Sequence, residues 1–506
     1  MRTESTEFAE SITVADLEAD PYPIYARLRA TAPVCFIPAV GLWFVTRYHD
    51  VEYTVTHPDL FTAEMDDSPV DRTFGSPTIL TVDGDRHLEL RKALDTKYRP
   101  KNVNAYIDDL VRPAARQLLD DLHGRDEAEL MAEYFEPLSV LSLGNVLGVG
   151  HLSAERLRDW FWRLHLGVIN FEGNPERADV GLTCSREIDE VLTPVFHRLA
   201  ADPDDSTISH LLHSGISNSG AASCRTQAQV MPTLKVILLG GMQEPGHGGG
   251  STLAGLLREP AQREAVQADP ERLLPAAVEE GLRWVSPIGT QTRQVVTDTW
   301  LAGTMLPRGA AIGALVSAAN RDETRFTDPD RFDIFRSRQS NLAFGSGKHF
   351  CAGHAFSRAQ IRIALEELLT RFPRLALAAD PDFRGWEFRA PRHLAVRLLH
   401  SLMPSPRISL ISAPSNLGLR PPQARAVPGT SKAPEAFREA GLYTRMAGHG
   451  AIDAGVVLPG RYVDDAKAGI ARSRNSAAVV DHARRLAARI GGHTDFRHPG
   501  PVLPSR

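Results

Sequence analysis

The sequence predicts a mainly α protein with small β-sheets, followed by a small, incomplete α/β segment at the C-terminus. Stretches with apolar residues three and four positions apart, the pattern of amphipathic helices, dominate the first 400 residues. Short apolar runs separated by glycine and proline cluster between residues 292 and 320, as expected for a small sheet. The composition then changes at SLMPSPR, residues 401–407, where two prolines follow a strand-like run.

The elements follow from this pattern in chain order. Residues 21–29, PYPIYARLR, predict a short helix opened by prolines, and residues 35–48 predict a hairpin that turns at Gly41. Long helices are expected to include residues 108–122, 153–164, 185–200 and 357–372. We therefore expect one large domain over residues 1–400, a linker at 401–408 and a C-terminal appendage over 409–506.

Composition limits the classes of function. The chain has 42% hydrophobic residues, 24% charged residues and a formal net charge of −5, which suits a globular protein and disfavours nucleic-acid binding. The four cysteines, at positions 35, 184, 224 and 351, are too far apart for a zinc site or redox dithiol. The N-terminus is acidic and lacks a long apolar run. We expect a cytoplasmic protein that binds neither nucleic acid nor membrane.

One cysteine stands in a distinctive loop. Residues 344–353, FGSGKHFCAG, join an apolar, strand-like run to a long amphipathic helix. Gly345 and Gly347 allow a tight turn, and Cys351 is expected near a helix N-terminus, which favours a thiolate. Phe344, Cys351 and Gly353 at this spacing resemble the haem-loop signature of the cytochrome P450 family. The resemblance implies haem b with Cys351 as its axial iron ligand, dioxygen as oxidant and electrons from a reductase.

Other segments extend this resemblance. Glu280 and Arg283, together with Arg331 in DPDRFDIFR, resemble the structural lock of the family. The resemblance also implies that the haem propionates contact four basic residues, namely His87, Arg91, Arg293 and His349. Asn341 stands where relatives often carry a histidine, so that propionate contact is not expected.

Residues 234–257, LKVILLGGMQEPGHGGGSTLAGLL, resemble the helix that crosses the distal face of the haem. Relatives usually place an acid and a threonine there, whereas this chain has Glu244 and Pro245. Proline can kink the helix but cannot supply a hydroxyl. Proton delivery must then use Glu244, an ordered water or a polar group of the substrate. The alternative is a helix that simply ends in a glycine-rich loop at residues 246–250.

The likeness narrows to one branch of the family. Segments such as DRTFGSP, GGMQEPGHG and EGLRWVSPI resemble the guaiacol O-demethylases, over about residues 15–398. This implies hydroxylation of the methoxy methyl of a small aromatic ether, with collapse to a phenol and formaldehyde. It also implies an iron–sulfur flavoprotein reductase as electron donor. The alternatives are a peroxide-driven haem enzyme and a bifunctional or scaffold protein.

The resemblance also implies a substrate pocket. Phe74 and Phe388 would sandwich the aromatic ring, and the other walls would come from Leu80, Val168, Val236, Gly240, Ile288 and Thr292. Val168 departs from the family's third phenylalanine, and Phe171 nearby is a candidate to refill the space. A one-residue deletion near Gly289 makes the alignment of Thr292 less direct.

Two further expectations concern the surface and the C-terminus. The electron donor is expected to dock on basic residues, namely Lys92, Lys97, Arg99, Lys101 and Lys348. Residues 407–492 resemble the opening of an arginase-type ureohydrolase but stop before its metal-binding motifs. His493 and Asp495 are isolated, so we expect the appendage to be catalytically inert.

Overall fold

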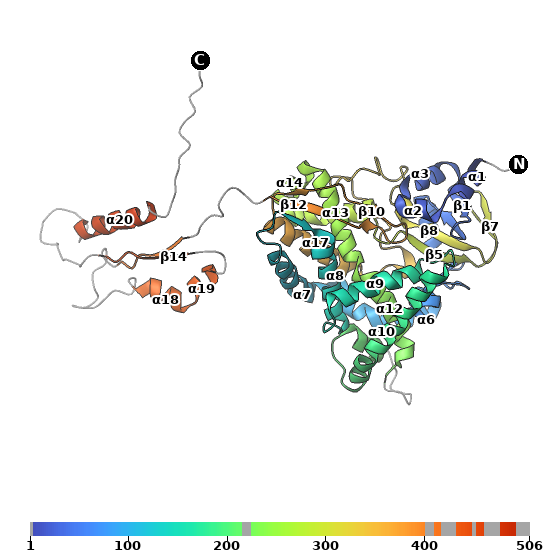
Figure 1. The fold of residues 1–506 in the computed structure, drawn as a ribbon, viewed down its shortest axis with the longest axis horizontal. Coiled ribbons are helices and arrows are strands. Elements are labelled where there is room, and N and C mark those ends of the chain that lie inside the picture. Colours follow the sequence, from blue (N-terminus) through green and yellow to red (C-terminus); the bar gives the residue numbers. More distant parts are fainter. Residues whose placement is uncertain are drawn as a thin grey trace, which may run out of the picture. The chain divides into compact units, whose positions relative to one another are not determined.

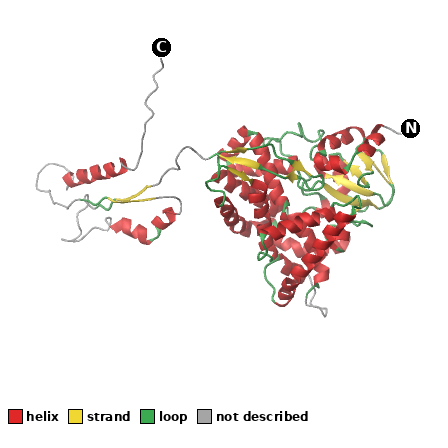
Figure 2. Ribbon diagram, viewed as in Figure 1, coloured by secondary structure: helices red, strands yellow, loops and turns green. Residues whose placement is uncertain are grey.

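A computed structural model describes residues 4–214, 224–399, 409–415, 432–447, 452–459 and 476–491. The chain divides into two compact units, Met1–His400 and Ser401–Arg506. The first unit is built mainly from helices, with short strands both beside its N-terminal elements and near its C-terminal end (Figures 1 and 2). This confirms the predicted mainly α fold with small sheets. No helix among the described residues is long and apolar enough to cross a membrane.

The first unit has seventeen α-helices among its described residues. The helices that precede residue 227 are α1 Glu4–Ser11, α2 Val14–Ala19, α3 Tyr22–Thr31, α4 Tyr48–Thr56, α5 Pro69–Phe74, α6 Gly84–Tyr98, α7 Pro100–Asp120, α8 Glu136–Leu147, α9 Ala154–Val168, α10 Pro175–Ala201 and α11 Thr207–His213. The later ones are α12 Gln227–Met242, α13 Glu244–Arg258, α14 Pro260–Ala268, α15 Pro270–Trp284, α16 Val316–Ala319 and α17 His354–Arg371. The predicted long helices correspond to α7, α9, α10 and α17.

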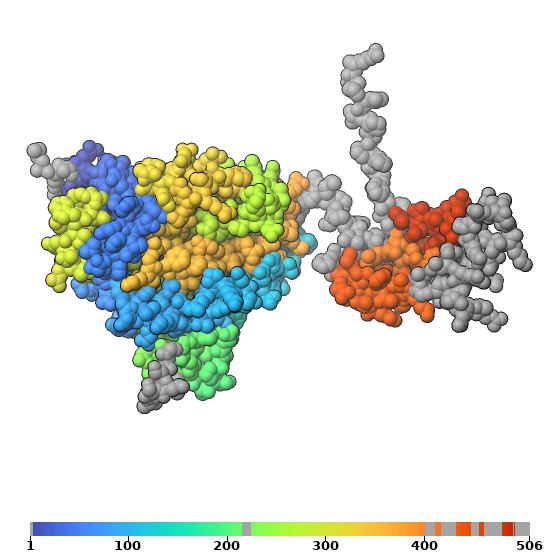
Figure 3. All heavy atoms as spheres, turned by 180° about the vertical axis from the view of Figure 1, so that it is seen from behind, coloured from blue at the N-terminus to red at the C-terminus, as the bar shows by residue number. Residues whose placement is uncertain are grey.

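Five strands form the largest sheet of the first unit, in the order β1-β2-β8-β5-β3. They are β1 Val34–Ile37, β2 Leu42–Val45, β3 Phe61–Thr62, β5 Thr290–Val295 and β8 Ala311–Leu315. The predicted hairpin is confirmed, because β1 and β2 pair antiparallel across a turn in which Gly41 has φ 65°. Segments far apart in sequence thus lie side by side, as the blue and yellow surfaces show in Figure 3.

Smaller pairings complete the first unit. A three-stranded sheet contains β4 Glu127–Glu129, β12 Ala395–Leu398 and β9 Leu375–Leu377, in that order. The strands β6 Thr299–Leu301 and β7 Thr304–Leu306 form one hairpin, and β10 Phe383–Arg384 pairs with β11 Ala390–Pro391. The run at residues 341–344, expected to be strand-like, has no regular structure. There the Asn341 side chain accepts a hydrogen bond from the Ala343 N–H at 3.0 Å, which favours a local turn over a strand.

The helix α13 runs through the core, where it packs against α15, α17 and the π-helix Met131–Phe135. Its glycines allow this close approach. A Cβ atom on Gly249 would lie 2.8 Å from the ring of Phe135, and one on Gly250 would lie 2.3 Å from the sulfur of Met131. The glycine-rich stretch is therefore helical, and the alternative of a loop at residues 246–250 is wrong.

The second unit contains a parallel pair of strands, β13 Ser409–Ser412 and β14 Ile452–Val456. Its described helices are α18 Ala433–Glu439, α19 Leu442–Ala447 and α20 Ser476–Gly491. The Ser412 and Tyr443 hydroxyls lie 2.5 Å apart, which ties β13 to α19. The expected linker at 401–408, His493 and Asp495 lie outside the described residues.

Candidate haem-thiolate site

The cysteine loop folds tightly between residue 344 and α17. Gly345 and Gly347 have φ values of 71° and 70°, which side chains with a Cβ rarely adopt. The Cys351 N–H donates to the Phe344 carbonyl at 3.0 Å and closes the loop. The guanidinium of Arg358 lies 4.3 Å from the centre of the Phe344 ring. These contacts fix the sulfur just before the first turn of α17.

Burial dominates the electrostatics of Cys351. It raises the pKa of the thiol, while the Gly353 N–H and the charges of Arg91 and Arg358 lower it less. The expected preference for a thiolate at this helix start is therefore outweighed by desolvation in the protein alone. A coordinated metal ion deprotonates a thiol outright, so the site is suited to a metal-bound sulfur.

Glu244 faces the same region from the distal helix. The helix breaks at Gln243, so that α12 ends at Met242 and α13 begins at Glu244. Burial raises the pKa of the Glu244 carboxyl to about 8, and both of its oxygens lack a hydrogen-bond partner among the described residues. A charge on Glu244 also acts to raise the pKa of Cys351, less than burial does. The break next to Pro245 agrees with the predicted kink.

The predicted propionate residues come together. The rings of His87 and His349 lie 4.1 Å apart, and the charges of Arg91 and Arg293 act on His87. Burial, followed by these neighbouring cations, lowers the pKa of His87 to about 4. Burial also lowers the pKa of Arg293 to about 10, and its Nη2 has no partner within the described part of the chain. Within the described residues, the Nη2 of Arg293 thus remains open to an anion.

Asp83 is the carboxylate at this cluster, and sequence reasoning missed it. His349 Nε2 lies 2.8 Å from Asp83 Oδ1, and the Thr62 hydroxyl donates to the other oxygen at 2.7 Å. Burial opposes ionisation of Asp83, but these hydrogen bonds outweigh it and hold the pKa below its usual range. Asp83 thus orients His349. Arg91 donates to the Phe350 carbonyl at 2.5 Å and joins α6 to the cysteine loop.

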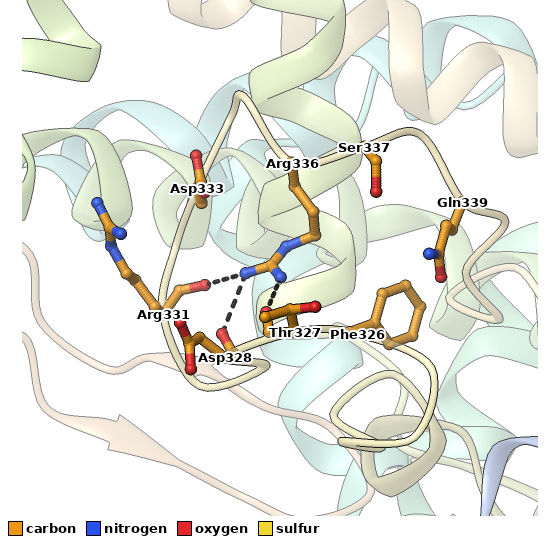
Figure 4. Close-up of a pocket in the computed structure, with 8 residues that line it drawn as sticks. All are labelled: Phe326, Thr327, Asp328, Arg331, Asp333, Arg336, Ser337 and Gln339. Carbon is orange, nitrogen blue, oxygen red and sulfur yellow. Dashed lines mark hydrogen bonds between the residues drawn. The ribbon is translucent and has the colours of Figure 1, made fainter.

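The lock around Glu280 differs from the prediction in one member. Arg283 donates to the Glu280 carboxylate at 2.7 and 2.8 Å, as expected. The third side chain is Arg336, whose Nε lies 3.4 Å from Glu280 Oε1. Arg331 contributes only its backbone carbonyl, which accepts from Arg336 at 2.9 Å (Figure 4). The segment DPDRFDIFR carries both arginines, and the turn that it forms presents the second one to Glu280.

The predicted substrate residues come from three helices, a strand and the segments between such elements. Phe74 ends α5 and is buried, and α5 packs against both α9 and α12, which carry Val168, Val236 and Gly240. Leu80 is 48% exposed, and a Cβ on Gly240 would meet no atom within 4 Å. Ile288 and Phe388 form an isolated antiparallel bridge, while Thr292 pairs with Gly313 in the sheet.

Two aromatic residues near this region were missed by sequence reasoning. The ring of Phe161 lies 6.0 Å from that of Phe388, edge to face, and the ring of His165 lies 5.1 Å from Phe388. His165 and Phe161 stand three and seven residues before Val168, and they are four residues apart, which places all three on one face of α9. This helical spacing in the sequence could have identified Phe161 and His165 as neighbours of Val168. Phe171 instead packs against Trp386, with ring centres 6.0 Å apart.

The donor set fits an iron protoporphyrin. Cys351 supplies a soft sulfur ligand, and the partnerless Nη2 of Arg293 in a buried cationic cluster suits a carboxylate. The distal side is bounded by the helix break at Gln243. Cys351 would hold the iron, and His87, Arg91, Arg293 and His349 would hold the propionates. Fold and site together define a haem-thiolate protein.

Comparison with known proteins agrees. The family model for Cytochrome P450 matches residues 271–381. Cytochrome P450 107B1 of Saccharopolyspora erythraea is 31% identical over 393 residues, which cover 73% of this chain and 92% of that protein. The steroid C26-monooxygenase of Mycolicibacterium smegmatis is 32% identical, over 70% of this chain and 86% of that protein. The chain belongs to the cytochrome P450 family.

A solved structure supports the same conclusion. The crystal structure of P450BioI in complex with an acyl carrier protein ligated to hexadec-9Z-enoic acid aligns with a TM-score of 0.68. The identity is 25%, and the alignment covers 76% of this chain and all of that one. Members of the family use haem b, dioxygen and electrons from redox partner proteins, so the chain is a haem-thiolate monooxygenase.

Proposed function

We propose that this monooxygenase hydroxylates the methoxy methyl of small, guaiacol-like aromatic ethers and so removes the methyl group. The observation that carries the proposal is the aromatic face on α9. Phe161, His165 and Val168 share that face, and Phe388 contacts it through the first two. Aromatic walls of this kind offer large, oriented contact area to a flat ligand with few polar atoms.

The close approach of α5 supports a narrow pocket. A Cβ on Gly167 would lie 2.7 Å from the Thr73 hydroxyl, so α5 lies directly against α9 beside Val168. This contact places α5, which ends at the buried Phe74, directly beside α9. A small planar substrate suits such a space better than a bulky one.

The ether, dioxygen, two electrons and two protons give a hydroxymethyl ether and water, and the hydroxymethyl ether then releases formaldehyde and leaves a phenol. Bound haem supplies the activation of dioxygen. The residues of the chain orient the ring, exclude water and deliver protons, for which the Glu244 carboxyl is the acid in reach, with Pro245 opening the helix beside it.

A titration tests the choice of substrate. Guaiacol, para-substituted methoxyarenes and syringol are added separately to the haem protein while the Soret band is followed. We expect guaiacol to produce a saturable shift, because an aromatic ether of its size displaces water near the iron. Absence of a shift with any methoxyarene would reject this substrate class.

Val168 should set the size limit of the pocket. A small branched side chain stands where the family offers a phenylalanine, and Phe171 does not replace it, because it packs against Trp386. Changing Val168 to phenylalanine should raise the ratio of the specificity constants for guaiacol and syringol by roughly 10- to 200-fold, the range for a methyl-sized difference in an apolar pocket. An unchanged ratio would mean that Val168 does not line the pocket.

We also propose that the electron donor is an iron–sulfur flavoprotein reductase that docks on the basic residues named above. Lys97 is the least available of them, because its Nζ lies 2.5 Å from Asp205 Oδ2. Charge complementarity at such a surface mainly raises the association rate.

We propose that residues 1–400 form the haem domain and that the arginase-like appendage has no part in catalysis. The first unit ends near β12, whose strand pairs with β4 and β9 inside that unit. Truncation after residue 400 should therefore leave the haem content and turnover within about twofold of the full chain, since surface changes usually cost little stability. The measurement is the ratio of haem to protein and the turnover of both forms. Loss of haem from the truncated form would contradict the proposal.

A further inference from the structure

Three residues at the break between α12 and α13 carry buried polar atoms that no described residue pairs. Gln243 Nε2 and Oε1, both oxygens of Glu244 and Nδ1 of His247 are buried and have no hydrogen-bond partner among the described residues. Glu244 and His247 stand three positions apart on α13 and so share one side of that helix, and Gln243 directly precedes it. Buried polar groups are nearly always paired, often through ordered water.

The outer end of this cluster continues toward the surface. His247 Nε2 lies 3.5 Å from Glu136 Oε1, at the start of α8. The other oxygen of Glu136 accepts from Arg158 Nε at 2.9 Å and from Nη2 at 2.5 Å. Arg158 lies on α9, and 27% of its side chain is exposed. Polar contacts thus connect the partly exposed Arg158 to His247, which stands three residues from Glu244 on α13.

We propose that protons reach the distal site along Glu136 and His247, and pass to Glu244 through ordered water held by Gln243. Monooxygenation consumes two protons and two electrons for each dioxygen, and the electrons come from the redox partner. With Pro245 in place of a hydroxyl residue, Glu244 needs another group to resupply its proton. His247 is the nearest titratable side chain along the helix, one turn away.

The surroundings suit this role. Burial opposes ionisation of Glu136, but the hydrogen bond and charge of His247 and the charge of Arg158 hold its pKa below the usual range. Arg158 therefore positions Glu136, and the carboxylate stays available to exchange a proton with His247. The His247 ring is held by Phe161 at 5.6 Å and by Trp162 at 5.9 Å. His165 and Arg392 are the other titratable groups near these rings.

The test compares His247→Phe and Glu136→Gln with the parent enzyme. His247→Phe keeps an aromatic ring and removes both nitrogens, while Glu136→Gln keeps the shape of the side chain. Trp162→Phe is the matched control, because it changes the packing on His247 without removing a polar relay atom. Each haem-loaded protein receives electrons from an NADH-dependent ferredoxin reductase and a ferredoxin. Dioxygen uptake, hydrogen peroxide and oxygenated product are measured in H₂O and D₂O.

We expect the two relay variants to divert dioxygen to hydrogen peroxide, which uses the same electrons and protons but oxidises no substrate. The product formed per NADH should fall by roughly tenfold or more, since positioned acid–base groups are worth 10²–10⁴ in rate and bulk water replaces part of that. The solvent isotope effect of the relay variants should rise, while their substrate dissociation constants stay within about twofold of the parent. In Trp162→Phe, the product formed per NADH and the isotope effect should both stay within about twofold of the parent.

Unchanged coupling and isotope effect in the relay variants would overturn the proposal, as would an equal loss in Trp162→Phe. If His247→Phe fails to bind haem, the coupling and the isotope effect of Glu136→Gln test the proposal. The proton route rests on the monooxygenase chemistry of the family and not on guaiacol. Any compound that shifts the Soret band can serve as substrate, so rejection of the guaiacol-like class leaves this test intact.

Discussion

Replacing Cys351 by alanine should abolish monooxygenase activity and the thiolate band of the reduced, carbon-monoxide-bound protein. The sulfur is held by the Cys351 N–H bond to Phe344 and by the loop's two left-handed glycines, and alanine cannot ligate iron. Cys351 would hold the haem iron, and a thiolate ligand would supply the electron density that favours O–O cleavage, so its loss should remove the chemistry as well as the spectrum. The carbon-monoxide difference spectrum and product formation are measured on the same sample.

Cys184→Ala is the matched control for that variant. Cys184 is fully buried on α10, and burial raises the pKa of its thiol to about 12, as expected for a cysteine that only packs. This control should keep the thiolate band and activity. Retention of the band in Cys351→Ala, or its loss in Cys184→Ala, would show that the ligand has been misassigned.

Replacing Glu280 by alanine should destabilise the first unit by about 3–5 kcal/mol, because it leaves buried cations without their partner. The carboxylate accepts two hydrogen bonds from Arg283 and one from the Asp333 N–H at 2.8 Å. Arg283 is 3% exposed, so water cannot replace these bonds. The measurement is the free energy of unfolding in urea, followed with haem absorbance and circular dichroism.

Arg331→Ala provides the contrast. Its side chain is exposed and only its carbonyl takes part in the network, so this variant should cost less than about 0.5 kcal/mol. Arg336→Ala should instead be clearly destabilising, since its guanidinium also donates to the Asp328 carbonyl at 3.1 Å. A loss in Arg331→Ala as large as that in Glu280→Ala would contradict the assignment of the lock.

The parts of the site that sequence reasoning predicted are those tied to strong local patterns. The glycine spacing before Cys351 and the Glu-x-x-Arg pair carry their own geometry, because a loop or one helical turn fixes it. Arg336 was missed because the choice between two arginines depends on how a loop without regular structure turns. Asp83 was missed because it reaches His349 only through folding, across more than 250 positions of the chain.

The glycines of α13 were also difficult to interpret from the sequence alone. Helix propensity alone disfavours four glycines within five residues, which is why a loop at residues 246–250 was an alternative. These residues are nevertheless helical and pack closely against the π-helix and α17. Larger side chains there would collide with Phe135, Met131 and Ile361. Such tertiary contacts are not visible in a single sequence.

The most direct test of the central proposal is the product balance with guaiacol in the presence of dioxygen, NADH and a ferredoxin-based donor. We expect catechol and formaldehyde in equal amounts, with one dioxygen consumed for each formaldehyde formed in coupled turnover. Methoxy-deuterated guaiacol should slow product formation, because the methyl C–H bond is the one that breaks. Hydroxylation of the ring without formaldehyde, or consumption of dioxygen without any product from guaiacol, would contradict O-demethylation.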